Sequence, residues 1–575
     1  MTLPRKVGWP AVACAGILAA HALLLGWSAA ANSATFDEPA HLAAGAACWR
    51  HGDFSIYSLS PPLLHLWAAL PAVLARAAVP PTTQADQHWI PERHWYYADQ
   101  FVYANFARFG FLLRLARWGM IPLSCLAGWI AYRWAAALYG PISGVAAVAL
   151  YCFNPEVLAH GSLATTDVGT AAAIFASCWL WWRFCRNPSA RTWLLTLLAV
   201  TAAHLCKFTA LLLWPMLLAM ALPLAAPSPR RRELLLAWLG LGAATLLLLN
   251  ALYGFAGTGQ RLGGYTFTSD LMLRVQRRMP AHLPVLLPQL WVAGFDAQKT
   301  DTQGGYQGFL FGQTYSGNRW YYYPAALLCK LPVSVLALFG VAVISLLAGR
   351  GRLWSGDHRD ERSMLWGGII YAAGVFFLSD LNIGVRYLLP AFPFAAILIS
   401  RLWKRQISMP GPLLHWGRNG LLAIAVLEAL WVCPRFLSFI NFAAGGPASG
   451  WRLLTDSDFD WGQGLIDLRK WMTDNSVPSV TLAYFGLVDP AVYGVHCTPI
   501  TRPDDESYVA VSSYYLNGLT NRMVIGPNRR AYIQLKYYQT LQTKKPVAVV
   551  GNTIFIYPRQ VIELAAAQAS LQSRP

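Results

Sequence analysis

Charged residues are scarce in this chain. Asp, Glu, Lys and Arg together make up 13% of its 575 residues, about half of their share in an average soluble domain. Hydrophobic residues make up 56%, and the mean hydropathy is +0.38. This composition excludes an ordinary soluble globular protein and indicates an integral membrane protein. The 25 Trp, 25 Tyr and 26 Phe residues suit the aromatic belts found at membrane interfaces.

Metal-binding and redox motifs are also missing. The ten cysteines contain no CxxC pair, and no group of His, Cys and Asp residues has the spacing of metal ligands. We therefore expect no metal site and no cofactor. Cys48 and Cys497 are the only cysteines in segments expected to face outward, and two separate thiols are favoured over one disulfide.

Long apolar runs, in contrast, recur along the chain. Crossing the hydrocarbon core of a bilayer takes about 20 residues of helix. Eleven runs meet or approach that length, at residues 9–31, 118–137, 142–160, 168–183, 192–207, 208–226, 234–253, 323–348, 364–380, 387–402 and 419–436. The first run is longer than the core of a typical cleavable signal peptide, so we expect it to remain as the first helix.

The placement of the basic residues predicts the topology. If the N-terminus is cytoplasmic, the inner segments hold seventeen of the 45 bases and four of the 27 acids. Their net charge is +13, which leaves only +5 of the total of +18 for the rest of the chain. An excess of bases on the inner side is typical of membrane proteins and argues against a nucleic-acid partner. The sequence predicts a cytoplasmic (inner) membrane protein with its N-terminus inside and its C-terminus outside.

The polar segments divide the chain into two parts. Residues 1–445 are expected to form an all-α, multi-span transmembrane domain with two outer loops, 32–117 and 254–322. Within the first loop, the amphiphilic stretch 61–77 is expected to lie as a helix along the membrane surface. Residues 446–575 are predicted to form a small extracytoplasmic α/β domain.

The tail carries patterns typical of both helix and strand. The stretch 462–472 has the periodicity of a helix. The stretches 479–486, 507–515 and 547–558 are rich in β-branched and aromatic residues, as strands are. With its 130 residues the tail is long enough to bury a core of its own.

Two adjacent acids, Asp37 and Glu38, follow the first apolar run and are expected at the outer membrane surface. They are candidates for acid–base chemistry, or alternatively for the cap of the helix that "EPAHLAAGAACW" predicts. His41 and His65 occur in the same outer loop and could share the site. Asp167 stands at the mouth of the fourth run, at the same membrane depth. Acids on separate outer loops are what proton transfer at an interface requires.

Three basic residues lie just inside the outer ends of apolar runs: Lys207, Lys330 and Arg386. Ionisable groups at such depths are costly and usually face a cavity. Snorkelling toward lipid headgroups is the alternative, and it suits Arg386 best and Lys330 least. Together the three cations predict a site for the phosphate of an anionic lipid. Glu428 and His204 also occur in apolar runs, where helix-to-helix pairing is expected.

Five stretches, in this order, resemble bacterial glycosyltransferases of the GT-C fold, in the protein O-mannosyltransferase and lipid A aminoarabinose transferase group that is often labelled family 39-like. They are "FDEPAHLAAGAACWRHGDF…PPLLHLW", "AHGSLATTDVGTAAAIF", "CKFTALLLWP", "WYYYPAALLCKLP" and "LNIGVRYLLPAFPF". The tail stretches "DSDFDWGQGL" and "LAYFGLVDPAVYGV" are similar to the outer domain of a bacterial subgroup. The ordered set covers nearly the whole chain.

The resemblance implies transfer of a sugar from a polyprenyl-phosphate-linked donor on the outer face of the membrane. It implies Asp37 as the general base with Glu38 beside it, and Asp167 as a second acid. Relatives often carry His, Glu or Lys just before the double proline, whereas this chain has Ser60 there, with His65 five residues later. The expected partners are the polyprenyl-phosphate sugar, membrane lipids, and an acceptor that is a protein, a lipid or a glycan.

The chemistry of such a transfer fits these residue types. A polyprenyl phosphate is already a good leaving group, so neither a nucleotide nor a metal is required. A base must take the proton of the acceptor hydroxyl, and cations must hold the departing phosphate. A single displacement inverts the anomeric carbon, because retention would require a second, nucleophilic carboxylate close to the first.

Two other classes of function compete with the enzyme hypothesis. One is a membrane transporter or a flippase for lipid-linked sugars, a class that usually shows inverted repeats; this sequence has no internal repeat. The other is a scaffold that presents the tail domain, which would leave the outer acids and the intramembrane cations unexplained.

Overall fold

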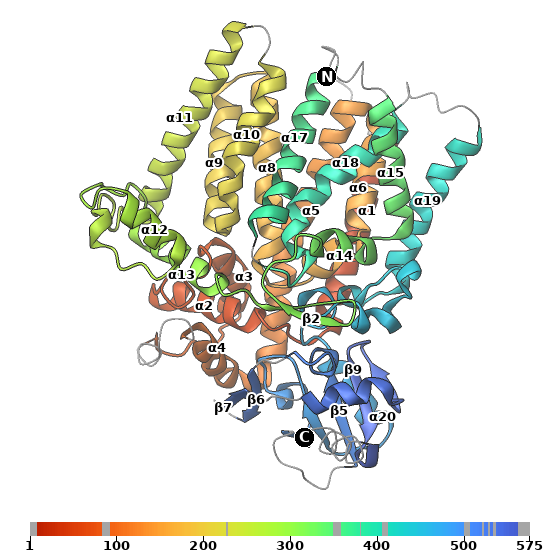
Figure 1. Cartoon of the computed structure of the whole chain (residues 1–575). Coiled ribbons are helices and arrows are strands. Elements are labelled where there is room, and N and C mark those ends of the chain that lie inside the picture. Colours follow the sequence, from red (N-terminus) through yellow and green to blue (C-terminus); the bar gives the residue numbers. More distant parts are fainter. Residues whose placement is uncertain are drawn as a thin grey trace, which may run out of the picture.

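The computed structural model describes residues 8–82, 93–225, 228–348, 358–379, 381–404, 412–499, 507–519, 522–526, 529–532 and 536–561. Parts of the predicted outer loop 32–117 and of the tail, and the end of the predicted span 208–226, lie outside these residues. The chain forms a helical bundle at one end and a small sheet at the other (Figure 1). The first helix begins at the end of the bundle that lies away from the terminal sheet (Figure 1).

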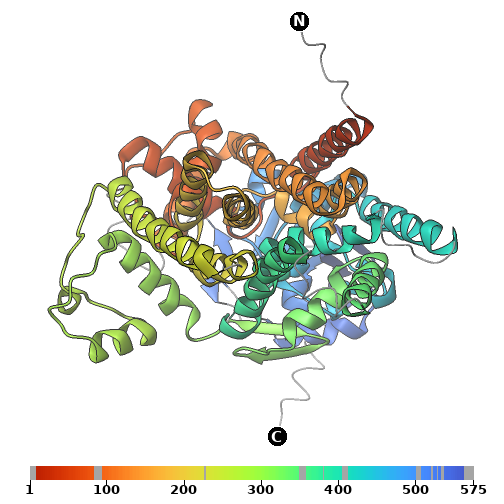
Figure 2. The same ribbon diagram turned by 90° about the horizontal axis from the view of Figure 1, so that it is seen from above.

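The bundle is built from helices that run roughly along one axis (Figures 1 and 2). They are α1 (Trp9–Ala31), α5 (Phe109–Tyr139), α6 (Pro141–Cys152), α8 (Thr166–Arg186), α9 (Ala190–Cys206), α10 (Leu213–Ala221), α11 (Ser228–Leu252), α15 (Val333–Ala348), α17 (Arg359–Leu378), α18 (Phe392–Ser400) and α19 (Pro412–Trp431). The span that contains α18 is 83% buried, whereas only 22% of the span in α1 and 28% of the span in α11 are buried. An apolar helix that is exposed on this scale is stable in lipid rather than in water.

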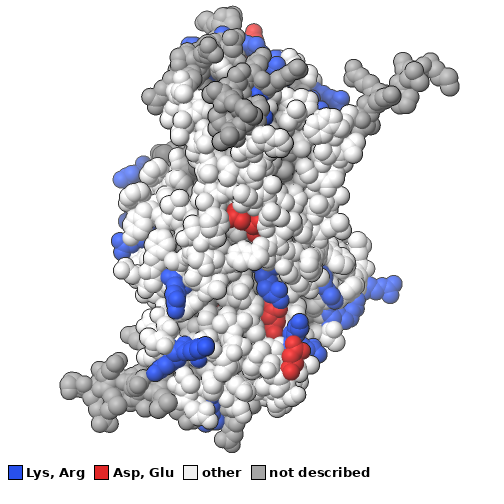
Figure 3. All heavy atoms as spheres, turned by 90° about the vertical axis from the view of Figure 1, so that its right-hand side faces the viewer, with Lys and Arg blue, Asp and Glu red and all other residues white. Residues whose placement is uncertain are grey.

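Among the described residues, four helices are long and apolar enough to cross a membrane, or six if each of two bent helix pairs counts as one span. The chain is thus a multi-pass membrane protein, while the eleven spans remain a prediction. One face of the molecule shows a broad band with few charged side chains between two more highly charged ends (Figure 3). Such a band is what a membrane-embedded surface requires.

Several predicted spans are broken rather than continuous. The run 142–160 divides into α6 and α7 (Pro155–Gly161), which meet at 61°. Asn154 caps α7, because its side chain accepts hydrogen bonds from the N–H groups of Glu156 and Val157. The run 323–348 divides into α14 (Tyr322–Lys330) and α15, which meet at 118° next to Pro332. Proline cannot donate a backbone hydrogen bond, and the residue before it disfavours helical geometry.

A layer of short elements lies between the bundle and the tail (Figure 1). It contains α2 (Glu38–His51), α3 (Leu63–Leu74), α4 (Arg93–Ala104), α12 (Asp270–Arg278), α13 (Gln289–Thr302) and the antiparallel hairpin of β1 (Gln307–Leu310) with β2 (Gln313–Ser316). The helix expected at 61–77 is α3. It packs so closely on α2 that a Cβ atom at Gly45 would overlap the backbone carbonyl group of His65.

The tail contains a five-stranded sheet in the order β4-β3-β5-β9-β8. Its strands are β3 (Val480–Ala483), β4 (Cys497–Pro499), β5 (Tyr508–Ser512), β8 (Ala548–Val550) and β9 (Ile554–Pro558), with a separate pair of β6 (Arg522–Gly526) and β7 (Arg529–Tyr532). Strand β3 runs parallel to β4 and β5, and β9 runs antiparallel to β5 and β8. The predicted helix is α20 (Leu465–Asp474), and each stretch predicted as a strand contains at least one. The end of the stretch 507–515, however, belongs to the short helix α21 (Ser513–Leu516).

The sheet is buried on both faces. On β9, Ile554 and Ile556 pack in one core with Leu465 and Leu468 of α20. The alternate residues, including Phe555, join the same apolar core as the bundle. Because successive side chains of a strand point to opposite faces, the sheet is held between α20 and the membrane-embedded part. The boundary at residue 446 remains a prediction. Cys48 and Cys497 form no disulfide with each other, as expected.

The close packing of α2 on α3 generates a prediction. Gly45→Ala should lower the stability by about 1–3 kcal/mol, because the two helices must separate to admit the methyl group. The matched control is Gly16→Ala in α1, where a Cβ atom meets no other atom within 4 Å. Thermal unfolding of both variants in detergent measures the difference. Equal midpoints for the two variants would show that α2 and α3 are not held this closely.

Candidate active site

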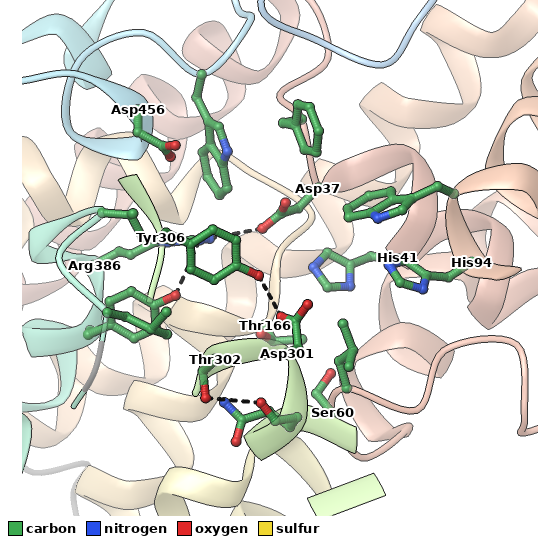
Figure 4. Close-up of a pocket in the computed structure, with 18 of the residues that line it drawn as sticks. Asp37, His41, Ser60, His94, Thr166, Asp301, Thr302, Tyr306, Arg386 and Asp456 are labelled. Atoms are coloured by element: carbon green, nitrogen blue, oxygen red, sulfur yellow. Dashed lines mark hydrogen bonds and ion pairs between the residues drawn. The ribbon is translucent and has the colours of Figure 1, made fainter. Parts of the chain in front are cut away.

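A cavity of about 480 Å³ lies where the bundle, the short outer elements and the tail meet (Figure 4). We call it the central cavity. Its walls come from six separate parts of the sequence: Phe36, Asp37, His41, Tyr57, Leu59, Ser60, His94, Trp95, Thr166, Lys207, Gln298, Asp301, Thr302, Tyr306, Gln307, Leu381, Ile383, Arg386, Tyr387, Asp456, Trp461, Phe485, Leu487 and Tyr514. Four of the residues expected to form a site, Asp37, His41, Lys207 and Arg386, line it together.

Two acids and two bases form the polar centre of this region. Arg386 Nη1 lies 3.0 Å from Asp37 Oδ2 and 3.5 Å from Asp167 Oδ2. On its other oxygen, Asp167 accepts a hydrogen bond of 2.7 Å from Lys207 Nζ. Two of the predicted acids and two of the three predicted cations therefore meet in the structure.

Asp37 and Asp167 differ in how tightly they are held. Asp167 is paired with both cations and its side chain is 2% exposed. Among the described residues, Asp37 pairs only with Arg386, and its side chain is 20% exposed. Asp37 stands at the N-cap position of α2, yet its side chain makes no capping hydrogen bond. Burial raises the pKa of the Asp37 carboxyl group, and the Arg386 charge opposes that rise. Of these two acids, Asp37 is the one that lines the central cavity.

Glu38 is not part of this centre, contrary to the prediction that it acts beside Asp37. It is fully buried, and its oxygens lie 2.7 and 2.6 Å from Nε and Nη2 of Arg117 on α5. It also accepts hydrogen bonds from the backbone N–H groups of Thr35 and Ala164. Burial alone would raise the pKa of Glu38, but Arg117 and these N–H groups outweigh it and lower the pKa. Glu38 is therefore a structural anchor of α2, held by Arg117 and two backbone N–H groups.

Lys330 does not line the central cavity either, so its prediction as a phosphate ligand is corrected. Its Nζ is fully buried, lies 2.9 Å from Glu156 Oε1, and donates to the carbonyl groups of Leu437 and Asp458. Glu428, for which the sequence predicts pairing between helices, accepts a hydrogen bond from Ser334. The bend after α14 ends the helix at Lys330, so the run 323–348 is not the single straight span that its hydropathy predicts.

The two predicted histidines form a chain behind the cavity wall. His41 lines the cavity, and its Nδ1 lies 3.0 Å from His65 Nε2, which in turn lies 3.1 Å from Ser60 Oγ. Burial lowers the pKa of His41 to about 3 and that of His65 well below its usual value. Both rings are therefore neutral at physiological pH, and only His41 can contact a molecule in the central cavity.

Other lining residues were not predicted from the sequence. The Tyr306 hydroxyl donates a hydrogen bond of 2.5 Å to Asp301 Oδ2, and the two come from α13 and the loop before β1. From the tail, Asp456 and Trp461 reach the cavity, with the Trp461 ring 4.3 Å from the guanidinium carbon of Arg386. Both residues belong to the stretch "DSDFDWGQGL", by which the tail resembles the outer domain of a bacterial subgroup. The acids of this stretch were the sequence feature that could have pointed to the site.

A second cavity, of about 590 Å³, adjoins the first and shares Tyr57, Leu59, Ser60, His94 and Asp301 with it. The rest of its wall is mainly apolar and aromatic, with Phe208, Tyr253, Tyr265, Phe267, Leu290 and Trp291. We call it the apolar cavity. Within the described ranges, no three His, Cys, Asp or Glu side chains are grouped as metal ligands.

Residues 101–253 match the family model described as dolichyl-phosphate-mannose-protein mannosyltransferase. The resemblance to GT-C glycosyltransferases that the motifs indicated is confirmed by this match. Among curated proteins, none matches the chain.

Two solved structures are similar in overall fold. ArnT from Cupriavidus metallidurans bound to undecaprenyl phosphate is 12% identical, with 92% of this chain and 98% of that chain covered and a TM-score of 0.47. The archaeal oligosaccharyltransferase AglB from Archaeoglobus fulgidus, in complex with an inhibitory peptide and a dolichol-phosphate, is 11% identical, with 96% and 76% covered and a TM-score of 0.45. Both TM-scores lie below 0.5, and neither likeness identifies an activity of this chain.

The environment of Lys330 generates a prediction. Lys330→Met should destabilise the protein by about 3–5 kcal/mol, because Glu156 would remain as an unpaired buried charge. The double variant Lys330→Met/Glu156→Gln removes both charges and should recover part of the loss. Thermal unfolding of the two variants measures this. An unchanged thermal midpoint together with a reduced affinity for undecaprenyl phosphate in Lys330→Met would show that Lys330 binds the phosphate after all.

Proposed function

We propose that this protein is a glycosyltransferase that moves a sugar from a polyprenyl-phosphate-linked donor to an acceptor at the outer membrane surface. The observation that carries the proposal is the arrangement of Asp37, Arg386 and Lys207 around one cavity. It combines a base that is open to the cavity with two cations suited to a phosphate. The matched family model, whose description names a dolichyl-phosphate-mannose donor, supports this donor class.

The proposed reaction is a single displacement. Asp37 takes the proton of the acceptor hydroxyl as its oxygen attacks the anomeric carbon. The bond from that carbon to the phosphate oxygen breaks, and the electron pair leaves with the polyprenyl phosphate. Lys207 and Arg386 stabilise the negative charge that develops on this phosphate, and they need no reorganisation because Asp167 already holds both in place. The anomeric carbon is inverted.

Arrival of the donor also frees the base. Arg386 is the ion-pair partner of Asp37, and a phosphate that binds the guanidinium competes with that carboxylate. Arginine binds phosphate oxygens with charge-assisted hydrogen bonds, often two at a time. Asp37 then gives up a partner at the moment when the acceptor hydroxyl must be deprotonated. The apolar cavity beside the site offers a place for the isoprenoid chain of the donor.

The flippase or transporter hypothesis gains one observation, namely the broken helices, which are common in transporters. In transporters, however, such breaks usually line an ion or substrate site. Here the charged groups nearest the breaks, Glu156 and Lys330, are fully buried and paired with each other. The glycosyltransferase hypothesis is therefore favoured, and cleavage of the donor separates the two, since a flippase releases no sugar.

The orientation of the chain is part of the proposal. We infer that the N-terminus is cytoplasmic and that the tail is outside the cytoplasmic membrane, since the inner segments carry the excess of bases. Alkaline phosphatase, which is active only outside the cytoplasm, should therefore be active when fused after Pro575. This topology would be contradicted if the alkaline phosphatase fusion were inactive while a second fusion at the same position, to a reporter that works only in the cytoplasm, were active.

The role of Asp37 is tested by Asp37→Asn, which keeps the shape of the side chain and removes its ability to accept a proton. Loss of a general base typically lowers the rate by about 10²–10⁴-fold. Release of labelled sugar from a polyprenyl-phosphate donor should fall by that factor, while affinity for undecaprenyl phosphate is retained or increased. The measurement uses purified protein in lipid nanodiscs.

Glu38→Gln is the matched control for this experiment, since the two acids are adjacent in sequence but differ in surroundings. It should lower the thermal midpoint, because Arg117 would lose its charged partner, and the surviving folded protein should still turn over. Near-normal turnover by Asp37→Asn would remove Asp37 as the base and make Asp167 the candidate.

A further inference from the structure

One wall of the central cavity belongs to the tail. Asp456, Trp461, Phe485 and Tyr514 form it, and we call them the tail wall. The rings of Phe485 and Tyr514 stack with centroids 3.8 Å apart, and the Trp461 ring lies against the Arg386 guanidinium. Figure 4 shows that Asp456, on a segment of the tail, lines the same cavity as Asp37 and Arg386. The displacement chemistry described above uses none of these four residues.

Asp456 differs from the two acids that follow it at alternate positions. Asp458 accepts hydrogen bonds from the Tyr322 hydroxyl (2.6 Å) and from the Val385 N–H (2.7 Å). Asp460 accepts from the hydroxyls of Ser512 and Ser513. Both are thus fully occupied structural groups. Within the described residues, the Asp456 carboxylate has one hydrogen-bond partner, the N–H of the adjacent Ser457, and it takes part in no ion pair.

The backbone holds Asp456 in an unfavourable conformation. Its φ is +56°, in the left-handed region that residues other than glycine rarely adopt. Such strain persists where the surroundings fix the chain, and it concentrates at functional sites. Here the anchor is Asp458, whose bond to the N–H of Val385 ties this segment to the residue before Arg386. The fold therefore fixes the carboxylate of Asp456 relative to the proposed phosphate site.

The position of Asp456 determines what it can contact. With the phosphate on Lys207 and Arg386, and the base Asp37 directed at the anomeric carbon, the sugar ring lies beside Arg386. That place is bounded by the tail wall. A carboxylate accepts hydrogen bonds on two oxygens and donates none when ionised, which suits sugar hydroxyl groups. Aromatic faces such as those of Trp461 and Tyr514 suit the apolar C–H side of a sugar ring.

We propose that Asp456 accepts hydrogen bonds from hydroxyl groups of the donor sugar, so that the tail wall selects which sugar the enzyme transfers. This inference rests on the proposed function. It assigns to the tail a role in specificity, and it leaves the phosphate to Lys207 and Arg386.

The test compares ligands with and without the sugar on purified full-length protein in nanodiscs. The probes are undecaprenyl phosphate and a panel of its hexose and pentose esters, and the ester that the wild type binds most tightly is carried forward. Asp456→Asn is the variant, because asparagine also tolerates a positive φ. Its affinity for the sugar ester should fall about 10- to 100-fold, with affinity for undecaprenyl phosphate unchanged. Asp474→Asn, at an exposed position of α20, should change neither.

A second arm changes the sugar and measures each ester on both the wild type and Asp456→Asn. The ligands are esters that each lack one hydroxyl group of the sugar. For at least one of them, the affinity of the wild type should fall to the affinity that Asp456→Asn has for the complete ester. Asp456→Asn should bind that deoxy ester with the same affinity as the wild type does, because the hydrogen bond that the substitution removes is already missing. Additive losses for every deoxy ester would overturn the assignment.

Three further results would overturn the inference: no loss in Asp456→Asn, an equal loss for undecaprenyl phosphate, or no ester that wild type prefers over undecaprenyl phosphate. Failure of the wild type to bind undecaprenyl phosphate at all would overturn the proposed function and this inference with it. The outcomes are therefore distinguishable.

Discussion

The ion pairs of one guanidinium organise the site. Arg386 lies between Asp37, which precedes α2, and Asp167, in the first turn of α8. It thus joins three segments that are far apart in sequence, since 130 residues separate Asp37 from Asp167 and 219 separate Asp167 from Arg386. Away from bulk water such pairs are strong, and the loss of one member leaves a costly unpaired charge. The same arrangement gives the site its chemistry, because a phosphate can replace a carboxylate at Arg386 without any change of fold.

Two buried ion pairs outside the cavity keep this centre in place. Glu38 and Arg117 fix the start of α2 against α5, directly after Asp37. Lys330 binds Glu156 of α7 and the carbonyl group of Asp458, while the Asp458 side chain holds Val385, next to Arg386. The membrane-embedded part and the tail thus share one polar frame. This explains why the tail sheet packs on the bundle instead of hanging from a linker.

Part of this site could be predicted from the sequence. Asp37, Asp167, Lys207 and Arg386 all occur where apolar runs meet polar segments, and charges at such boundaries share one membrane depth. Position along a run does not reveal which face of a helix a side chain occupies, so Glu38 and Lys330 were misplaced. The bend at Pro332 and the break before Pro155 also divided runs that looked continuous. Asp456 was missed because its role depends on a strained backbone and on a tail 419 residues distant from Asp37 in the chain.

The central claim is that Lys207 and Arg386 hold the phosphate of a polyprenyl-phosphate donor beside Asp37. A cryo-electron-microscopy structure of the full-length protein with undecaprenyl phosphate tests it most directly. We expect the phosphate in the central cavity, with oxygens about 3 Å from Lys207 Nζ and the Arg386 guanidinium, and Asp37 no longer paired with Arg386. A phosphate bound elsewhere, with the Arg386–Asp37 ion pair intact, would contradict the account.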